Sequence, residues 1–338
     1  AIHESVSTIE LAGVVKLVRK IVAGTLAFEL AGAVLLATRF VPKFGFAKGC
    51  YMGFFHAVSA FCNAGFDLMG IEEAYSSLVA FEGDVVVNLT VMALIVIGGA
   101  GFLVWDDLHR NKLHFRKYLL HTKIMLLTSG ILIFGGAVLF YLLEKDNVLA
   151  GMNGREQILG SLFGVVTPRT AGFNTVDTGA LTEGGKFLTI VLMFIGGGSG
   201  STAGGVKVTT AVVMLLSMLS MIRGTHGVNI LDRRLEEDAV KRASTIVTLN
   251  MVLALAAVLL LLAIQPLSLT DVMFEVFSAI GTAGMTTGIT RSLHPMSRAV
   301  LILLMYCGRL GSLTFTLIFA GRKPEPPVKQ PVEKIVVG

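Results

Sequence analysis

Three segments of the chain have residue types that can bind a cation through their backbone carbonyls. Each consists of an apolar stretch, a turn of small residues centred on Ala-Gly, and a polar exit; they are FFHAVSAFCNAGFD (Phe54–Asp67), SLFGVVTPRTAGFN (Ser161–Asn174) and FEVFSAIGTAGMTT (Phe274–Thr287). The turns recur at intervals of about 110 residues, and a long, nearly constant interval is typical of a repeated architectural unit.

The Ala-Gly turns predict a selectivity filter for a monovalent cation. Glycine permits backbone conformations that larger residues avoid, so carbonyls can converge on a narrow axis. A ring of such carbonyls can replace the hydration shell of the ion, and a half-helix that ends at the turn directs the negative end of its dipole towards it. Glycine turns that only join helices are the alternative, which three copies at matched positions disfavour. The predicted filter residues are Asn63, Ala64, Gly65, Phe66, Thr170, Ala171, Gly172, Phe173, Thr282, Ala283, Gly284 and Met285.

The elements that must position these turns are membrane helices. Hydrophobic residues make up 54% of the sequence and charged residues 15%, with a mean hydropathy of +0.76, which is too little charge to cover the surface of a water-soluble domain. The three cysteines have no disulfide-framework or metal-ligand spacing. We expect His56, on the first half-helix, to be a buried hydrogen-bonded group rather than a ligand.

The sequence predicts an all-α integral membrane protein built from repeats of span, pore loop and span. A span needs about 20 apolar residues of helix. The stretch between the two spans of each repeat is too short to cross, so we expect a half-helix that enters the membrane and returns. The predicted spans are Ile21–Val41, Val85–Trp105, Ile124–Leu143, Phe187–Ile222 (interrupted in the middle), Ile246–Ile264 and Ala299–Phe319.

The distribution of charge predicts the orientation of these spans. Basic residues gather before the first span, between the second and third, between the fourth and fifth, and in the tail. By the positive-inside rule these segments are cytoplasmic. The segments that follow the Ala-Gly turns are acidic or neutral, so we expect the turns to face outside; their acidic residues are Glu72, Glu73, Glu82, Asp84, Asp177 and Glu183.

Two further features lie at membrane depth and differ from ordinary spans. The stretch IGGGSGSTAGG (Ile195–Gly205) interrupts the fourth span, and it is no phosphate-binding loop because the Gly-Lys-Ser/Thr sequence is missing. Non-helical backbone at this depth must be buried in protein or line water, which predicts a flexible loop below the filter. Arg309 lies in the apolar last span, where an arginine usually lines a cavity or forms an internal ion pair; Glu29 is the candidate partner for the latter.

The motifs NAGF (Asn63–Phe66), TPRTAGFN (Thr167–Asn174) and SAIGTAGMTTG (Ser278–Gly288) resemble the filter sequences of the bacterial Trk/Ktr potassium transporters. In detail the chain is similar to the ion-translocating membrane subunit of the Ktr type. The resemblance extends over nearly the whole chain and includes LHTKIMLLTSG (Leu120–Gly130), MFIGGGSGSTAGGVKVTT (Met193–Thr210) and CGRLGSLTF (Cys307–Phe315).

The resemblance implies four repeats arranged with pseudo-fourfold symmetry around one pore, of which this chain resembles the second to fourth. We therefore expect a first repeat, with its own filter segment, to be missing from the sequence. The expected divisions are residues 1–117 for the second repeat, 118–235 for the third with its broken inner helix, 236–321 for the fourth, and 322–338 for a cytoplasmic tail.

The resemblance also implies a gate. The loop corresponds to the intramembrane gating loop of the family, and Arg309 would lie beneath the filter as an electrostatic barrier to a resting cation. The predicted gate residues are Gly196, Gly197, Gly198, Ser199, Gly200, Ser201, Thr202, Ala203, Gly204, Gly205, Lys207 and Arg309.

The function that follows is potassium uptake across the bacterial cytoplasmic (inner) membrane by a multi-pass protein, with sodium dependence left open. K⁺ would bind carbonyls around Gly65, Gly172 and Gly284, and no other cofactor is expected. The alternatives are a secondary transporter of sodium or of a small solute, and an enzyme, which the sequence disfavours because it lacks a catalytic constellation. The resemblance implies a homodimer on a cytoplasmic ring of nucleotide-binding RCK-type regulators, contact with membrane lipids and no nucleic-acid partner.

Overall fold

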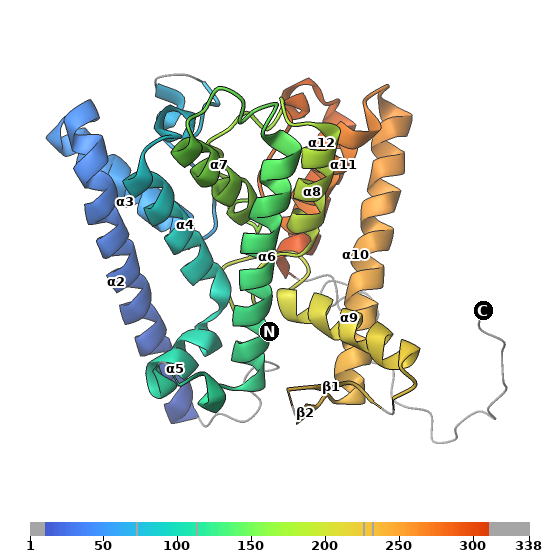
Figure 1. The fold of residues 1–338 in the computed structure, drawn as a ribbon. Helices are drawn as coiled ribbons and strands as arrows, with labels where there is room; N and C mark the ends of the chain where they lie inside the picture. The colour runs from blue at the N-terminus through green and yellow to red at the C-terminus, as the bar shows by residue number, and fades with distance from the viewer. Residues whose placement is uncertain (1–10, 72–73, 113, 226, 232, 311–338) are drawn as a thin grey trace.

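The computed structural model describes residues 11–71, 74–112, 114–225, 227–231 and 233–310. Helices are the main secondary structure of these residues, and non-helical connections join them (Figure 1). The helices are α2 (Leu11–Phe44), α3 (Phe46–Phe61), α4 (Val85–Ala100), α5 (Phe102–Asn111), α6 (Leu120–Glu144), α7 (Gly154–Val166), α8 (Glu183–Phe194), α9 (Val208–Ile222), α10 (Glu237–Ile264), α11 (Leu269–Gly281) and α12 (Pro295–Leu310). Strands β1 (Asn229–Ile230) and β2 (Arg233–Arg234) form a short antiparallel hairpin.

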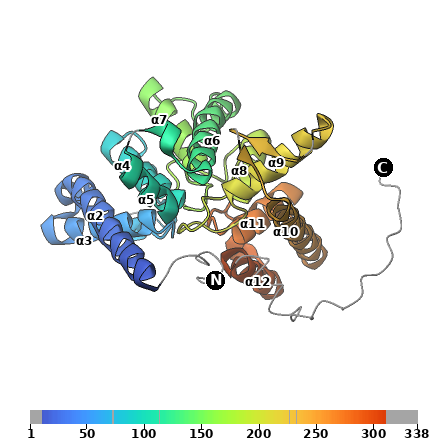
Figure 2. The same cartoon turned by 90° about the horizontal axis from the view of Figure 1, so that it is seen from below.

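The helices form three units of outer helix, half-helix and inner helix. They are α2–α3–α4, α6–α7–α8 and α10–α11–α12, and each half-helix packs against helices of its own unit. Seen from below, the units follow one another around a common centre (Figure 2). The expected repeat divisions after residues 117 and 235 fall in the connections before α6 and α10.

Within the described part of the chain, three helices are long and apolar enough to cross a membrane: Leu17–Phe44, Leu120–Glu144 and Glu237–Ile264. They cover the predicted first, third and fifth spans. Large apolar side chains on them stay exposed, including Val34 (65%), Ile131 (70%) and Leu259 (70%). A continuous exposed apolar face of this kind is the surface that contacts lipid rather than water.

The predicted second span, Val85–Trp105, is wrong at its end. α4 stops at Ala100, and the chain turns by 96° at Gly101 (φ 101°) into α5. α5 carries polar residues on one side, among them Asp107 and Arg110, so continuing straight would drive these groups into hydrocarbon. The bend lets α5 lie across the lower side of the molecule (Figure 1).

The predicted break in the fourth span is confirmed, because α8 ends at Phe194 and α9 begins at Val208. The two helices are not collinear: α9 lies across the lower part of the molecule, against α10 and α6 (Figure 1). The last helix, α12, is described from Pro295 to Leu310, and the predicted remainder of that span lies outside the described residues.

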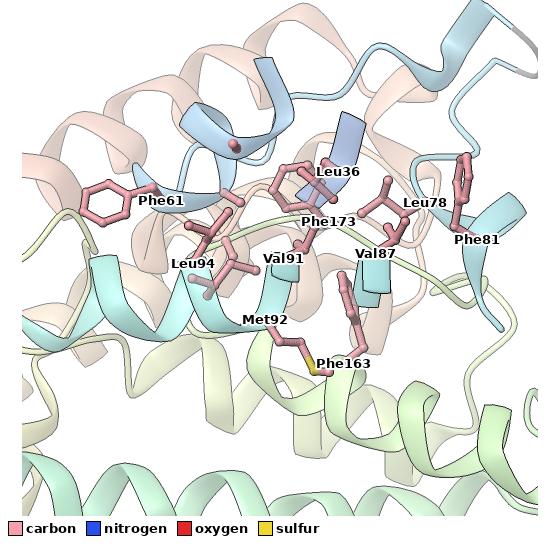
Figure 3. Packing of buried hydrophobic residues seen from close by; sticks show 14 of the residues in the cluster. Leu36, Phe61, Leu78, Phe81, Val87, Val91, Met92, Leu94, Phe163 and Phe173 are labelled. Carbon is pink, nitrogen blue, oxygen red and sulfur yellow. The ribbon is translucent and has the colours of Figure 1, made fainter. Parts of the chain in front are cut away.

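The largest buried cluster joins the first unit to the second. Leu36 of α2, Phe61 of α3 and Leu94 of α4 pack in one core with Phe163 of α7 and Phe173 from the turn that follows it (Figure 3). Because a residue of the second Ala-Gly turn is part of this core, the turn is fixed to the neighbouring unit by apolar packing as well as to its own half-helix.

Candidate functional site

The three half-helices end immediately before the predicted filter turns. The polar residues Asn63, Thr170 and Thr282 each have positive φ, at 51°, 71° and 53°. The glycines two positions later also have positive φ, at 73°, 88° and 76° for Gly65, Gly172 and Gly284. The same backbone turn is therefore built three times, and glycine occupies the position where a side chain would be strained.

The turns approach one another so closely that two of the glycines have no room for a side chain. A Cβ on Gly172 would lie 2.5 Å from the carbonyl oxygen of Ala283, and one on Gly65 would overlap the carbonyl oxygen of Ala171. A Cβ on Gly284 would meet nothing within 4 Å. Each of the first two turns thus places its glycine against a carbonyl of the next turn along the chain.

A side-chain hydrogen bond ties each half-helix to the segment that leaves its turn. Ser59 donates its hydroxyl to the Phe66 carbonyl at 2.7 Å, and Thr167 donates to the Phe173 carbonyl. In the third copy the buried carboxylate of Glu275 accepts from the hydroxyls of Thr286 and Thr290. A polar group of its own unit therefore bonds the exit of every turn, through the backbone in the first two copies and through side chains in the third.

The prediction for His56 is confirmed, because its side chain is fully buried and hydrogen-bonded. Its Nδ1 lies 2.7 Å from the Met52 carbonyl, and its Nε2 accepts from the Leu68 amide at 3.2 Å. The network assigns the proton to Nδ1. His56 is thus a second tie between α3 and the exit of the first turn.

The interruption of the fourth span is a loop whose two ends are paired. The Gly196 amide donates to the Val206 carbonyl at 2.8 Å, and the Val208 amide donates to the Gly197 carbonyl at 3.0 Å. The chain therefore leaves the line of α8 and returns to nearly the same point before α9 begins.

The loop lies directly against all three filter turns. The hydroxyl of Thr202 donates to Asn63 Oδ1 at 3.1 Å in the first turn. A Cβ on Gly196 would lie 3.1 Å from Thr170 Cγ2 of the second turn, and one on Gly204 would overlap the Thr282 hydroxyl of the third. The residues of the loop that the sequence singled out are thus gathered beneath the polar residues that begin the filter turns.

The loop is also attached to the bend between α4 and α5. The Gly198 amide donates to the Gly99 carbonyl at 2.7 Å, and the Phe102 amide donates to the Gly200 carbonyl at 3.0 Å. A Cβ on Gly101 would lie 2.6 Å from the Ser199 carbonyl oxygen. The inner helices of the first and second units therefore meet at their breaks.

Arg309 and Lys207 both donate to carbonyls of the loop. The Arg309 guanidinium binds the Thr202 carbonyl, and the Lys207 ammonium binds the Ala203 carbonyl at 2.5 Å. The alternative of an Arg309–Glu29 ion pair is not what the structure shows, since Glu29 instead accepts from the Cys62 thiol, with a sulfur–oxygen distance of 3.8 Å.

Sequence reasoning missed the part played by the glycines at the end of α4. They form the run Ile97–Gly101, IGGAG, which partly repeats the IGGGSG of Ile195–Gly200. Comparison of the two inner helices would have revealed a second break at this position. Glu275 was also missed, since a carboxylate on an apolar helix gives no sign that its partners are the hydroxyls of its own repeat.

The chain matches a family model described as "TrkH: Cation transport protein" over residues 2–330. It is 39% identical to the potassium/sodium uptake protein NtpJ of Enterococcus hirae and 34% identical to the Ktr system potassium uptake protein B of Bacillus subtilis. Each alignment covers 100% of this chain and 75% of the relative.

Among solved structures, the fold is similar to that of the potassium transporter TrkH from Vibrio parahaemolyticus, with a TM-score of 0.69 and 19% sequence identity. The match covers 87% of this chain and 62% of that one. At this identity the likeness supports the all-helical repeat fold.

Proposed function

The chain belongs to the TrkH family of cation transport proteins, and we propose that it takes up potassium across the bacterial cytoplasmic membrane. The family is one of membrane ion transporters, so the expectation that the chain is not an enzyme is confirmed. The relatives named as Ktr and potassium/sodium uptake proteins support potassium as the transported ion, with sodium as the second candidate.

We propose that Gly65, Gly172 and Gly284 and the residues around them form the selectivity filter. The observation that carries this proposal is the approach of one turn's carbonyls to the next turn's glycines, at the ends of three half-helices. Carbonyl oxygens so arranged are hard, neutral ligands suited to a dehydrated monovalent cation. The negative ends of three helix dipoles add to the favourable potential.

The loop from Gly196 to Gly205, with Lys207 and Arg309, is the proposed gate. Its contacts with all three turns support a position on the ion path directly below the filter. Arg309 adds a positive charge at the same level through its bond to Thr202. An ion that has left the filter would meet this backbone and this charge first.

The names of the Ktr relatives imply a system of more than one component. We propose that the partner is a cytoplasmic ring of RCK-type nucleotide-binding subunits and that two copies of the membrane subunit assemble on it. The basic connections near Lys117 and Arg234 suit such docking, because both lie on the lower side of the molecule (Figure 1).

Ion flux into liposomes tests the proposed function. Purified protein in vesicles under a potassium gradient, followed with an ion-sensitive dye, is expected to pass K⁺ about a hundredfold or more faster than Na⁺, equal to about 2.7 kcal/mol of discrimination. Vesicles without protein provide the baseline. Equal K⁺ and Na⁺ flux through folded protein, or flux of neither, would contradict the proposal.

A further inference from the structure

A cavity of about 670 Å³ lies on the lower side of the molecule, beside the bend between α4 and α5 to which the loop is attached. It is enclosed by the first part of α2, the end of α4, α5 and the start of α6, and its lining includes Leu17, Ile21, Val96, Leu108 and Leu126. This volume is in the range of specific small-molecule sites. Figure 1 shows α5 near the lower end of α2, and residues of both helices line the cavity.

One face of α2 forms a wall of the cavity. Leu17, Lys20, Ile21, Gly24 and Phe28 all line it, and their spacing places them on a single helical stripe. The neighbouring α2 residues outside this stripe include the exposed apolar Val18 (51%) and Val22 (52%), and the exposed Arg19. The cavity therefore lies beside the lower part of α2, at the start of a stretch that is long and apolar enough to cross a membrane.

The two ends of the cavity differ in chemistry. The inner end is aromatic: the Trp105 ring lies 5.3 Å from that of Phe28 and 5.4 Å from that of Phe61, measured between centroids. The outer end is charged, with Lys20 and Arg110 both paired with Asp106 at 3.0 Å and 2.6 Å. Of these three residues, Lys20 and Asp106 line the cavity; when the neighbouring Asp107 is counted, the charges at this end balance.

We propose that this cavity binds one acyl chain of an anionic phospholipid from the cytoplasmic leaflet, with the lipid phosphate at Lys20 and Arg110. An apolar chamber with a lysine and an arginine side chain near its mouth matches an amphiphile with an anionic head. Anionic lipids are concentrated at the cytoplasmic surface, where each Lys or Arg contributes about 1 kcal/mol of attraction. A water-soluble anion would use the mouth and leave the apolar chamber empty.

Trp105 provides the test because it is the only tryptophan of the sequence and lies at the inner end of the cavity. The protein is placed in phosphatidylcholine vesicles with a minor fraction of brominated phosphatidylglycerol or, in a matched set, of brominated phosphatidylcholine. Bromine on the acyl chain quenches indole fluorescence on contact, and a Trp105→Phe variant supplies the background. The site predicts stronger quenching by the phosphatidylglycerol.

Two pairs of variants sharpen the result. Ala23→Phe fills the cavity that Ala23 lines, and should remove the excess quenching, whereas Ala27→Phe, one turn along on an exposed position, should not. Lys20→Gln should weaken the headgroup preference about fivefold. Arg19→Gln removes the same charge from a residue that does not line the cavity, and should have less effect.

Equal quenching by the two lipids, or quenching that survives Ala23→Phe, would overturn the proposal in favour of ordinary bilayer contact. No quenching by either lipid would show that the cavity holds something else, such as a segment present in the longer relatives, and would overturn it too. Because fluorescence needs no ion flux, this result is independent of whether the protein transports potassium.

Discussion

The filter turns and the loop below them are both rich in glycine, yet they are stabilised in different ways. Each turn is bound by groups of its own half-helix, such as Ser59 for the first turn and Thr167 for the second. The loop is bound mainly by other units, through Gly99, Asn63 and Arg309. Hydrogen bonds within one unit hold each turn in place whenever its half-helix is folded. The conformation of the loop instead depends on how the units are placed relative to one another. A filter needs the first property and a gate needs the second.

The largest expected effect is that of Gly172→Ser on selectivity. The new side chain must occupy a positive φ, which costs about 1–3 kcal/mol, and its Cβ meets the Ala283 carbonyl oxygen. We expect the K⁺ over Na⁺ preference to fall by about a hundredfold in liposome flux, the equivalent of about 2.7 kcal/mol.

Gly284→Ser is the matched control for this prediction. Gly284 has the same left-handed backbone, but a Cβ there meets no atom within 4 Å. Its loss of selectivity should be smaller. If the two variants behave alike, the strained backbone matters and the close approach of neighbouring turns does not.

Arg309→Ala should raise the resting flux of potassium. A unit charge about 4 Å from a cation costs roughly 4 kcal/mol at an effective dielectric of 20, and water in the pore reduces this, so we expect about a tenfold increase without the cytoplasmic partner. Arg309→Lys keeps the charge and should stay close to the unaltered protein. Unchanged flux through a folded Arg309→Ala protein would contradict this prediction. It would show that the loop backbone, and not the charge of Arg309, is the barrier to the ion.

The smallest expected effect is that of Gly101→Ala, which tests the attachment of the loop to the bend. The added methyl lies 2.6 Å from the Ser199 carbonyl oxygen and should displace the loop, at the cost of about one hydrogen bond, raising resting flux about threefold.

Gly151→Ala introduces the same kind of backbone strain in open space, since Gly151 has φ 84° and no atom within 4 Å. Its flux should be unchanged. Equal flux in the two variants would show that the bend does not hold the loop.

The difference between bonds within one unit and contacts between units also separates what could be predicted from the sequence from what could not. The half-helices and the repeated turns follow from local patterns, and Gly65, Gly172 and Gly284 do lie at turns with the same left-handed backbone. The interruption at Ile195–Gly205 was also evident, because a dense run of glycines disfavours a continuous helix in an otherwise apolar span.

The arrangement around the loop could not be predicted, because it rests on contacts between distant segments. The dense glycines suggested a loop that is easy to rearrange. The structure instead shows that Gly196 and Gly204 permit close packing beneath Thr170 and Thr282. The partner of Arg309 was missed for a related reason: it is a backbone carbonyl, that of Thr202, which no side-chain pattern reveals.

The presence of several repeats in one chain has a consequence for how such a pore can change over generations. In a ring of identical subunits every substitution appears in all copies. One arginine codon would therefore place a positive charge in the pore from every subunit. Copies of a loop as long as Gly196–Gly205 would also overlap sterically at the pore axis. Here the repeats are joined by covalent bonds and can diverge separately. Asn63 already differs from Thr170 and Thr282, which occupy the equivalent positions. Covalent fusion therefore allows a single obstruction under a nearly symmetric filter, which is an asymmetry that a homo-oligomer cannot encode.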